Sequence, residues 1–489
     1  MYSASATFNT LIKKTERTFA YSGSIEATGG QSYTYAGSDL RSGRLFRAIS
    51  NDTLEIGTVY AAEYDCDLAL EISRYELYNG VITLDIELEG AADVIPMGEF
   101  NISEINQTAD RLQIKSYDNM VKFNKTFSKA SDNAIRTPYV WLETMCTACG
   151  VVLGSTAAEI KALANGTRMT AFADVVTDVE TWRDVLHYLA AYLAAYAYIG
   201  RDGKLYLSKY KGVSNDTIPA SFRYASELSD FRTTYDGLYA VYKAEGMQEY
   251  VSNTNSGGLV LDIGINPFLQ FTNAQSRISA LQEIIDAFDG IYYVPYSSTV
   301  PMNPLYDVGD VITFTGNQAD AYDYGAITEI DLTIGSSMRV TCAGDNPRLA
   351  AAQDRFSKSI EGLSSEYANG QEIGGKNFWI LISDNTDDIE ATSSKTQVAE
   401  IEWNQITDVQ KIGMMYTCTA IVSATATVQL ELSVDDEANY TFVPDEEKLL
   451  LGKRIISANC GFQVEGKGLH TAKVYMTVTD SPLLWGDLA

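Results

Sequence analysis

The sequence predicts a mainly β protein with an α/β insertion: two related β-barrels, a helical lobe between them, and a C-terminal β-sandwich. Apolar and polar residues alternate with period two in short runs over residues 1–127, 216–351 and 377–489, which is typical of half-buried strands. Longer amphipathic runs with helix caps are concentrated in residues 128–215. Since 46% of the residues are hydrophobic, we expect folded domains rather than a disordered chain.

Residues 1–127 are predicted to form the first barrel. Glycine, asparagine and aspartate separate the alternating runs, as expected for the turns of an antiparallel sheet. Asn79-Gly80 lies between residues 76–78 and 81–83 and predicts a hairpin at that point. The expected strands are residues 18–25, 31–35, 43–49, 58–70, 80–88, 98–105 and 111–117.

Residues 128–215 are predicted to form an α/β lobe. Thr137 and Pro138 suit the start of a helix and Gly150 suits its end, so we expect a helix over residues 138–149. Two further helices are expected over residues 157–164 and 181–198, and the second has tyrosines at a spacing of four. Asp202-Gly203 then predicts a turn into a short strand.

Residues 216–351 are predicted to form a second barrel, with one helix over residues 274–288. An internal repeat supports this prediction. Residues 324–345 contain a strand, a polar turn and a second strand that ends in Gly344-Asp345, and residues 97–118 contain the same pattern ending in Tyr117-Asp118. We therefore predict that the two barrels are duplicates.

Residues 352–376 are predicted to be a helix followed by a glycine-containing linker. Four apolar side chains recur there at spacings of four, three and four, as in a short coiled-coil seam: Phe356, Ile360, Leu363 and Tyr367. They fit either packing on the neighbouring barrel or a three-fold contact between chains.

Residues 377–489 are predicted to form a jelly-roll-like β-sandwich, because their expected strands are evenly spaced. Four aromatic side chains of this region are candidates for stacking on a sugar ring: Trp379, Trp403, Tyr440 and Trp485.

Composition limits the classes of function. The net charge of −28 disfavours a protein that binds nucleic acid through its phosphates, but not a conduit through which DNA slides without adhering. Six cysteines in 489 residues are too few for a disulfide scaffold. Residues 1–20 lack the apolar core of a signal peptide, and no apolar run has the length of a membrane span.

Residues for catalysis are scarce. Cys146 and Cys149 are the one CxxC pair, and the chain has only two histidines, so we expect both cysteines to be buried packing residues rather than a metal or redox site. His187 is expected to have a structural role on its helix, and His470 is expected to lie in a loop after Gly466 and Gly468. Acidic runs such as Asp435-Asp436-Glu437 are expected to be solvated loops. The sequence therefore predicts no enzymatic activity and no cofactor.

Several motifs, in their order along the chain, resemble those of phage tail hub proteins, which form the baseplate hub or tail tip. The resemblance extends over roughly residues 1–350 and depends on the order of the motifs rather than on any single one. The motifs are Met97-Gly98-x-Phe100, Ser116-Tyr117-Asp118-Asn119-Met120, Thr137-Pro138-Tyr139-x-Trp141-Leu142, Thr181-Trp182-Arg183-Asp184, Asp202-Gly203-Lys204-Leu205, Asn266-Pro267-Phe268 and Pro304-x-x-x-Val308-Gly309-Asp310.

The resemblance implies two tube-type β-barrels per chain and a homotrimer that closes the distal end of the tail tube. The implied partners are the tail tube or distal tail protein ring, the tape-measure protein, and spike or receptor-binding proteins, with DNA passing without specific binding. The implied location is the phage tail of the virion, assembled in the host cytoplasm. Two alternatives use residues 377–489 instead: an adhesin for a host-surface glycan, or a glycan hydrolase with paired carboxylates.

Overall fold

The structure is a computed structural model of the 489-residue chain. It describes residues 1–51, 53–108, 111–128, 134–176, 179–244, 246–317, 319, 323–347, 391, 393–405, 409–422, 426–436, 438–449, 452–466 and 468–480. The chain divides into two compact units, Met1–Gly370 and Gln371–Ala489. The prediction of a mainly β protein with an α/β insertion is confirmed.

The first part of unit 1 is built almost entirely from strands, which the alternation of apolar and polar residues predicted. Every second side chain of β4 and β5 is buried, so each strand has one face toward the core. The elements are α1 (Ala6–Leu11), β1 (Phe19–Glu26), β2 (Ser32–Ala36), β3 (Leu40–Ala48), β4 (Glu63–Leu68), α2 (Arg74–Leu77), β5 (Val81–Leu88), β6 (Val94–Gln107), β7 (Leu112–Tyr117) and the 3-10 helix η1 (Asn119–Asn124).

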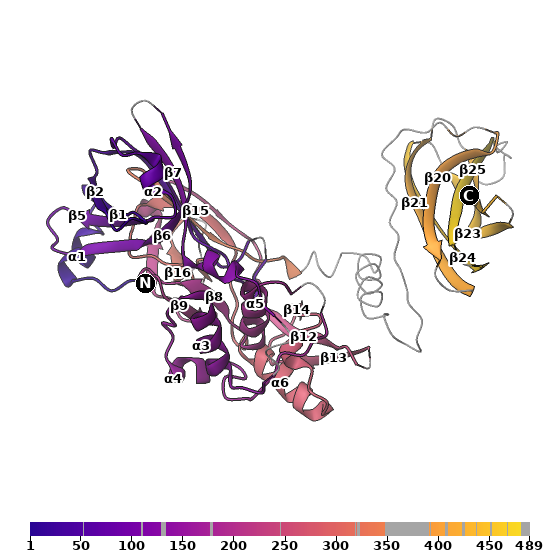
Figure 1. Ribbon diagram of the computed structural model, residues 1–489, viewed down its shortest axis with the longest axis horizontal. Coiled ribbons are helices and arrows are strands. Elements are labelled where there is room, and N and C mark those ends of the chain that lie inside the picture. Colours follow the sequence, from indigo (N-terminus) through magenta and orange to yellow (C-terminus); the bar gives the residue numbers. More distant parts are fainter. Residues whose placement is uncertain are drawn as a thin grey trace. The chain divides into compact units, whose positions relative to one another are not determined.

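The helical lobe follows, and Figure 1 shows its helices grouped beside two short strands. Its first helix begins and ends where the sequence predicts, because Pro138 occupies the first turn and Gly150 adopts a φ of 67° at the end. The elements are α3 (Pro138–Cys149), α4 (Ala157–Lys161), α5 (Trp182–Tyr192), β8 (Tyr196–Ile199) and β9 (Leu205–Ser208).

The last part of unit 1 returns to strands but contains an insertion. Between β11 and β15 the chain forms the three-stranded sheet β13-β12-β14, which packs on α6. The elements are β10 (Asp216–Pro219), the 3-10 helix η3 (Ala220–Phe222), β11 (Ala225–Leu228), β12 (Tyr235–Tyr242), β13 (Met247–Ser252), β14 (Leu259–Asp262), the 3-10 helix η4 (Pro267–Leu269), α6 (Ala274–Asp286), β15 (Tyr296–Pro301), β16 (Val311–Thr315), β17 (Tyr324–Ala326), β18 (Glu329–Thr333) and β19 (Ser337–Cys342).

One antiparallel sheet of 11 strands joins the two predicted barrel segments, in the order β11-β15-β19-β18-β3-β4-β7-β6-β5-β1-β2. The order contains a repeat. We call the strands β3, β4, β6 and β7 module 1, and the strands β11, β15, β18 and β19 module 2. In each module the first and second strands along the chain lie first and second in the sheet, the third lies fourth, and the fourth lies third. The repeat predicted from sequence falls on their equivalent hairpins, β6–β7 and β18–β19.

Several predicted elements are wrong in extent or type. The strand expected over residues 58–70 is only Glu63–Leu68, and the helix expected over residues 157–164 ends at Lys161. The helix expected over residues 181–198 ends at Tyr192, because Ala194 adopts a φ of 50° and Tyr196 begins β8, which pairs with β9. Residues 76–78 are not a strand before Asn79-Gly80: Glu76 and Leu77 belong to α2. Asn79 does adopt the positive φ of a turn residue, so the turn was predicted correctly and the strand before it was not.

The described residues of unit 2 form a sheet of six antiparallel strands, drawn in orange to yellow in Figure 1. Their order in the sheet is β20-β25-β22-β23-β24-β21, and inward side chains such as Leu432, Ile456 and Val474 share one core. The strands are β20 (Thr396–Gln405), β21 (Val409–Val422), β22 (Ala426–Val434), β23 (Ala438–Leu449), β24 (Gly452–Glu465) and β25 (Gly468–Asp480).

None of the helices within the described ranges combines the length and the apolar character that a bilayer crossing requires.

We predict that residues 371–489 fold when they are expressed alone, because unit 2 has its own hydrophobic core. Circular dichroism should show a β spectrum and a cooperative thermal transition. The matched fragment, residues 1–370, should also unfold cooperatively. A fragment 371–489 without a cooperative transition would contradict the division into two units.

Candidate functional site

The joint between the two modules is the antiparallel pairing of β18 with β3. The register runs from Glu329 opposite Ala48 to Thr333 opposite Arg44. On the outer face, Arg44 binds Asp331 through two hydrogen bonds, Nε to Oδ1 at 2.8 Å and Nη2 to Oδ2 at 3.0 Å. Arg47 of β3 points to the opposite side and is buried. The two faces of this joint therefore have one exposed and one buried arginine.

A cluster of three charged residues lies behind the joint. Arg47 Nη1 donates to Asp307 Oδ1 at 2.7 Å, and Arg201 Nε donates to Asp307 Oδ2 at 3.0 Å. Burial raises the pKa of Asp307, but the guanidinium groups of Arg47 and Arg201 outweigh burial and bring this pKa down to about 2. Asp307 is therefore a carboxylate at neutral pH. Arg47 belongs to module 1, Arg201 to the lobe and Asp307 to the loop after β15. Their ion pairs therefore hold these three parts of unit 1 together.

The Arg201 side chain also binds backbone carbonyls of the loop after β15. Its Nη1 donates to the carbonyl of Pro304 at 2.8 Å and its Nη2 donates to that of Tyr306 at 2.9 Å. In the same loop, Gly309 has a φ of 82°, and a side chain there would collide with the hydroxyl of Tyr196. The motif Pro304-x-x-x-Val308-Gly309-Asp310 thus provides the close contact between this loop and the lobe.

The motif at residues 116–120 connects module 1 to the lobe from another side. Asp118 is buried, and its carboxylate accepts hydrogen bonds from the amides of Ala62 and Met120, both at 2.9 Å. Burial raises the pKa of Asp118 to about 6, although these amides oppose the shift. Asn119 Nδ2 donates to the carbonyl of Gly203 at 2.7 Å, in the turn between β8 and β9.

Aromatic packing joins the lobe to the insertion in module 2. Phe268 of η4 has its ring centroid 5.4 Å from those of both Trp141 and Phe172, in edge-to-face contacts. Asn266 Nδ2 donates to the carbonyl of Tyr188 in α5 at 2.8 Å. Asn266-Pro267-Phe268 is therefore a packing motif.

Cys146 and Cys149 lie on α3 at the edge of the lobe's core. Burial raises the pKa of the Cys146 thiol to about 12 and that of Cys149 to about 11. Both thiols are protonated at neutral pH, and both cysteines are free.

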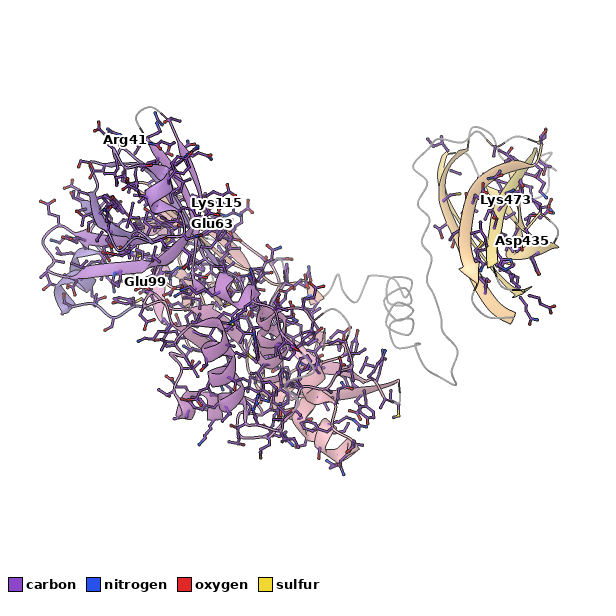
Figure 2. All side chains as sticks on the ribbon, in the orientation of Figure 1. Arg41, Glu63, Glu99, Lys115, Asp435 and Lys473 are labelled. Carbon is purple, nitrogen blue, oxygen red and sulfur yellow. The ribbon has the colours of Figure 1, made fainter. Side chains whose placement is uncertain are left out.

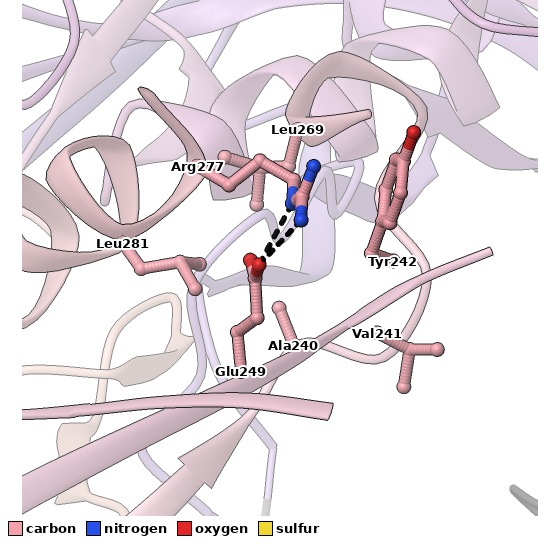
Figure 3. A pocket seen from close by; sticks show the side chains of 7 residues that line it. All are labelled: Ala240, Val241, Tyr242, Glu249, Leu269, Arg277 and Leu281. Atoms are coloured by element: carbon pink, nitrogen blue, oxygen red, sulfur yellow. Dashed lines mark hydrogen bonds and ion pairs between the residues drawn. The ribbon is translucent and has the colours of Figure 1, made fainter. Parts of the chain in front are cut away.

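Figure 3 shows a second buried ion pair, between α6 and β13. Arg277 Nε and Nη2 lie 2.8 Å from Glu249 Oε1, and the guanidinium lies 3.7 Å from the ring centroid of Tyr242. The adjoining cavity is 10 Å³, which is room for about one water molecule. This site fixes the helix on its sheet and leaves no room for a ligand.

The outer face of module 1 is charged but contains both signs, and Figure 2 shows Glu63 close to Lys115 there. Lys115 Nζ lies 3.6 Å from Glu63 Oε1. Asp65 points to the same side as Glu63, since the two are two positions apart on β4. Burial and the neighbouring Glu63 raise the pKa of Asp65 to about 6. Passage of DNA along an acidic wall stays a prediction.

In unit 2, the rings of Trp403 and Tyr440 both lie beside the ring of Phe462. The ring centroid of Phe462 is 5.2 Å from that of Tyr440 and 6.4 Å from that of Trp403. His470 stacks on Trp403 at 5.6 Å with an interplanar angle of 27°, so one face of the indole is covered. Sugar stacking on Trp403 and Tyr440 stays a prediction. Six further predicted residues lie outside the described residues: Trp379, Trp485, Phe356, Ile360, Leu363 and Tyr367.

His470 joins two turns at one end of unit 2. Its Nδ1 lies 2.8 Å from Asp435 Oδ2 and its Nε2 lies 3.1 Å from the carbonyl of Gly466. Both neighbours are acceptors, so an imidazolium, which has a proton on each nitrogen, satisfies both contacts. The hydrogen bond to Asp435 raises the pKa of His470. Sequence reasoning treated both residues as parts of solvated loops and missed this pair.

Within the same described ranges, no group of three or more histidine, cysteine, aspartate or glutamate side chains is arranged to hold a metal ion.

The comparisons with known proteins give structural likenesses only. No protein-family model matches the sequence, and no curated protein matches it. The chain is similar to the 43 kDa tail protein of prophage MuSo2 from Shewanella oneidensis, with 10% identity, a TM-score of 0.42 and coverage of 66% of this chain and 96% of that one. It is similar to a tail protein from Neisseria meningitidis MC58, with 12% identity, a TM-score of 0.42 and coverage of 66% and 97%. It is similar to prophage tail protein gp18 from Listeria monocytogenes EGD-e, with 10% identity, a TM-score of 0.43 and coverage of 71% and 100%.

We predict that Asp307→Ala lowers the free energy of unfolding of unit 1 by about 3–5 kcal/mol, because two buried guanidinium groups lose their carboxylate. Chemical denaturation of the full chain measures the change. Because the pKa of Asp307 is depressed, its stabilisation is present above pH 3.8 and is lost as the pH falls through about 2.

The matched control is Asp331→Ala, which removes the exposed partner of Arg44. This change should cost only about 0–1 kcal/mol. Equal losses from the two substitutions would contradict the role assigned to Asp307.

We predict that the end of unit 2 that contains His470 is more stable at acidic pH. The pKa of His470 is raised, so its stabilisation is fully present below pH 6.5 and is lost as the pH rises through the higher folded pKa. Hydrogen–deuterium exchange of residues 466–473, corrected for intrinsic rates, should be slower below pH 6.5 than at pH 8. Asp435→Asn should abolish the difference, and Asp436→Asn, whose partner is Lys473, should retain it.

Proposed function

We propose that this chain is a structural hub protein of a phage tail tip or baseplate, and that a homotrimer of it closes the distal end of the tail tube. The observation that supports the proposal most is the tandem repeat of two modules with one strand order in one continuous sheet. The ordered hub motifs support it as well, since several of them lie at contacts that join the modules to the lobe.

The repeat also indicates how chains would join. Inside the chain, the third strand of module 2 pairs with the first strand of module 1, that is, β18 with β3. The equivalent third strand of module 1 is β6, and beyond Ile102 the described structure pairs it with β7 on one side only. The equivalent first strand of module 2 is β11, which is an edge strand. Pairing β6 of one chain with β11 of the next would repeat the joint between chains.

Three chains joined in this way contain six modules, so a trimer would match the docking edges of a hexameric tube ring. A contact between different edges that closes on itself generates such a ring. In this proposal the tube or distal tail ring, the tape-measure protein and the spike or receptor-binding proteins are partners. DNA passes through without specific binding, since the net charge of −28 disfavours adhesion.

We predict that the chain in solution has three times the mass of one chain, and that Ser226→Pro reduces it to monomers. Ser229 donates its amide to the Pro295 carbonyl at 2.9 Å, so by antiparallel alternation the Ser226 amide points away from β15 toward the open edge. Proline removes that amide without losing a bond to β15. Light scattering coupled to gel filtration measures the mass.

The matched control is Ser226→Ala, which keeps the amide. The Ser226 hydroxyl has no hydrogen-bond partner within the described residues, so its removal loses no bond. The alanine variant should remain trimeric. A wild-type chain that is monomeric at high concentration would overturn the trimer, and a trimeric proline variant would overturn the β6–β11 contact.

A further inference from the structure

A cavity of 220 Å³ lies in unit 1 between the segment after α1 and the strand β10. All four residues of β10 line it, together with Arg17, Phe222 and Tyr306. Pockets for drug-sized ligands are usually about 300–1,000 Å³, so this cavity suits one or two side chains rather than a cofactor.

β10 is an edge strand. It pairs in parallel with β16, and the three-stranded sheet β10-β16-β17 has no further strand on its outer side within the described structure. Exposed strand edges present unpaired backbone groups that can pair with another extended chain. The cavity therefore lies along a strand that has no strand partner on its outer side in this part of the structure.

Two cations line the cavity in a chain with an excess of acidic residues. Arg17 Nη1 donates to the carbonyls of Ile12 at 2.9 Å and Met302 at 3.2 Å, and its guanidinium lies 5.8 Å from the Phe222 ring centroid. Burial lowers the pKa of Arg17. Lys13 is exposed beside it. In the described structure neither cation forms an ion pair, although the chain has 64 acidic residues against 36 lysines and arginines.

The one carboxylate that lines the cavity already has its own partners. Asp216 accepts a hydrogen bond from the Tyr306 hydroxyl at 2.9 Å and another from the Thr217 amide at 2.8 Å. It is therefore satisfied without Arg17 or Lys13. The remaining walls include apolar side chains of Ile12, Ile218 and Val300. The cavity thus has a cationic side, an apolar wall and an open strand edge.

We propose that this cavity binds an extended acidic segment of another protein, which lies along β10 as an added strand. An acidic side chain of the segment pairs with Arg17 and Lys13, and an apolar side chain next to it fills the cavity. Charge complementarity favours an acidic segment, because a basic segment would be repelled by Arg17 and Lys13. The inference depends on contacts within unit 1 and not on the proposed role in a phage tail.

The test is fluorescence anisotropy of the full chain with a fluorescein-labelled pentapeptide of alternating aspartate and valine at low salt. Low salt limits screening of the two charges. We expect saturable binding, and binding weaker by about tenfold or more with Lys13→Glu. Lys13→Glu leaves the two carbonyl contacts of Arg17 in place. The matched control is Lys14→Glu, an exposed neighbour that does not line the cavity, which should bind as the wild type does.

Two further peptides test the charge and the strand pairing. A peptide with lysine in place of aspartate should not bind. A peptide with N-methyl groups on two adjacent central residues should bind at least about tenfold more weakly, because one of those amides faces the strand edge. Equal binding of the lysine peptide, or equal effects of the Lys13 and Lys14 substitutions, would overturn the site. Equal binding of the N-methyl peptide would overturn the added strand.

Discussion

The architecture of unit 1 depends on Asp307, which holds Arg47 and Arg201 behind the pairing of β18 with β3. Strand pairing alone joins two edges, but it does not fix how the lobe and the loop after β15 lie against them. A carboxylate between two buried guanidinium groups does so, because any displacement would leave a charge without its partner. Hydrogen bonds from the Arg201 guanidinium to the carbonyls of Pro304 and Tyr306 extend the same constraint to the loop.

The sequence predicted an element well where the residue types at its ends also suit the backbone conformation found there. Pro138 and Gly150 fix both ends of α3, and the repeated strand–turn–strand pattern falls on equivalent hairpins of the two modules. The end of α5 was not predictable in this way. Its run of alanine and tyrosine suits a helix as well as a strand, and the pairing of Tyr196–Ile199 with β9 decides the outcome.

The clusters that organise the molecule were beyond sequence reasoning for a different reason. Asp307 is 260 positions from Arg47 and 106 from Arg201, and no periodicity links residues at such separations. The same holds for His470 and Asp435, which looked like loop residues until the strand register of unit 2 placed their turns together. The sequence motifs contain Asp118 and Asn266 but do not show what these residues do. In the structure both side chains form hydrogen bonds that join different elements, which only the fold defines.

The two kinds of joint in the proposed ring would differ in mechanical strength. A joint inside a chain has strand pairing, the buried charges around Asp307 and the continuous backbone of the lobe to resist separation. A joint between chains would have two strand edges without that buried cluster. Outward force on such a ring would therefore separate the chains at the joints between them while each pair of modules stays intact. The ring would open as three rigid bodies that move apart. The passage would then widen without unfolding any strand of the sheet.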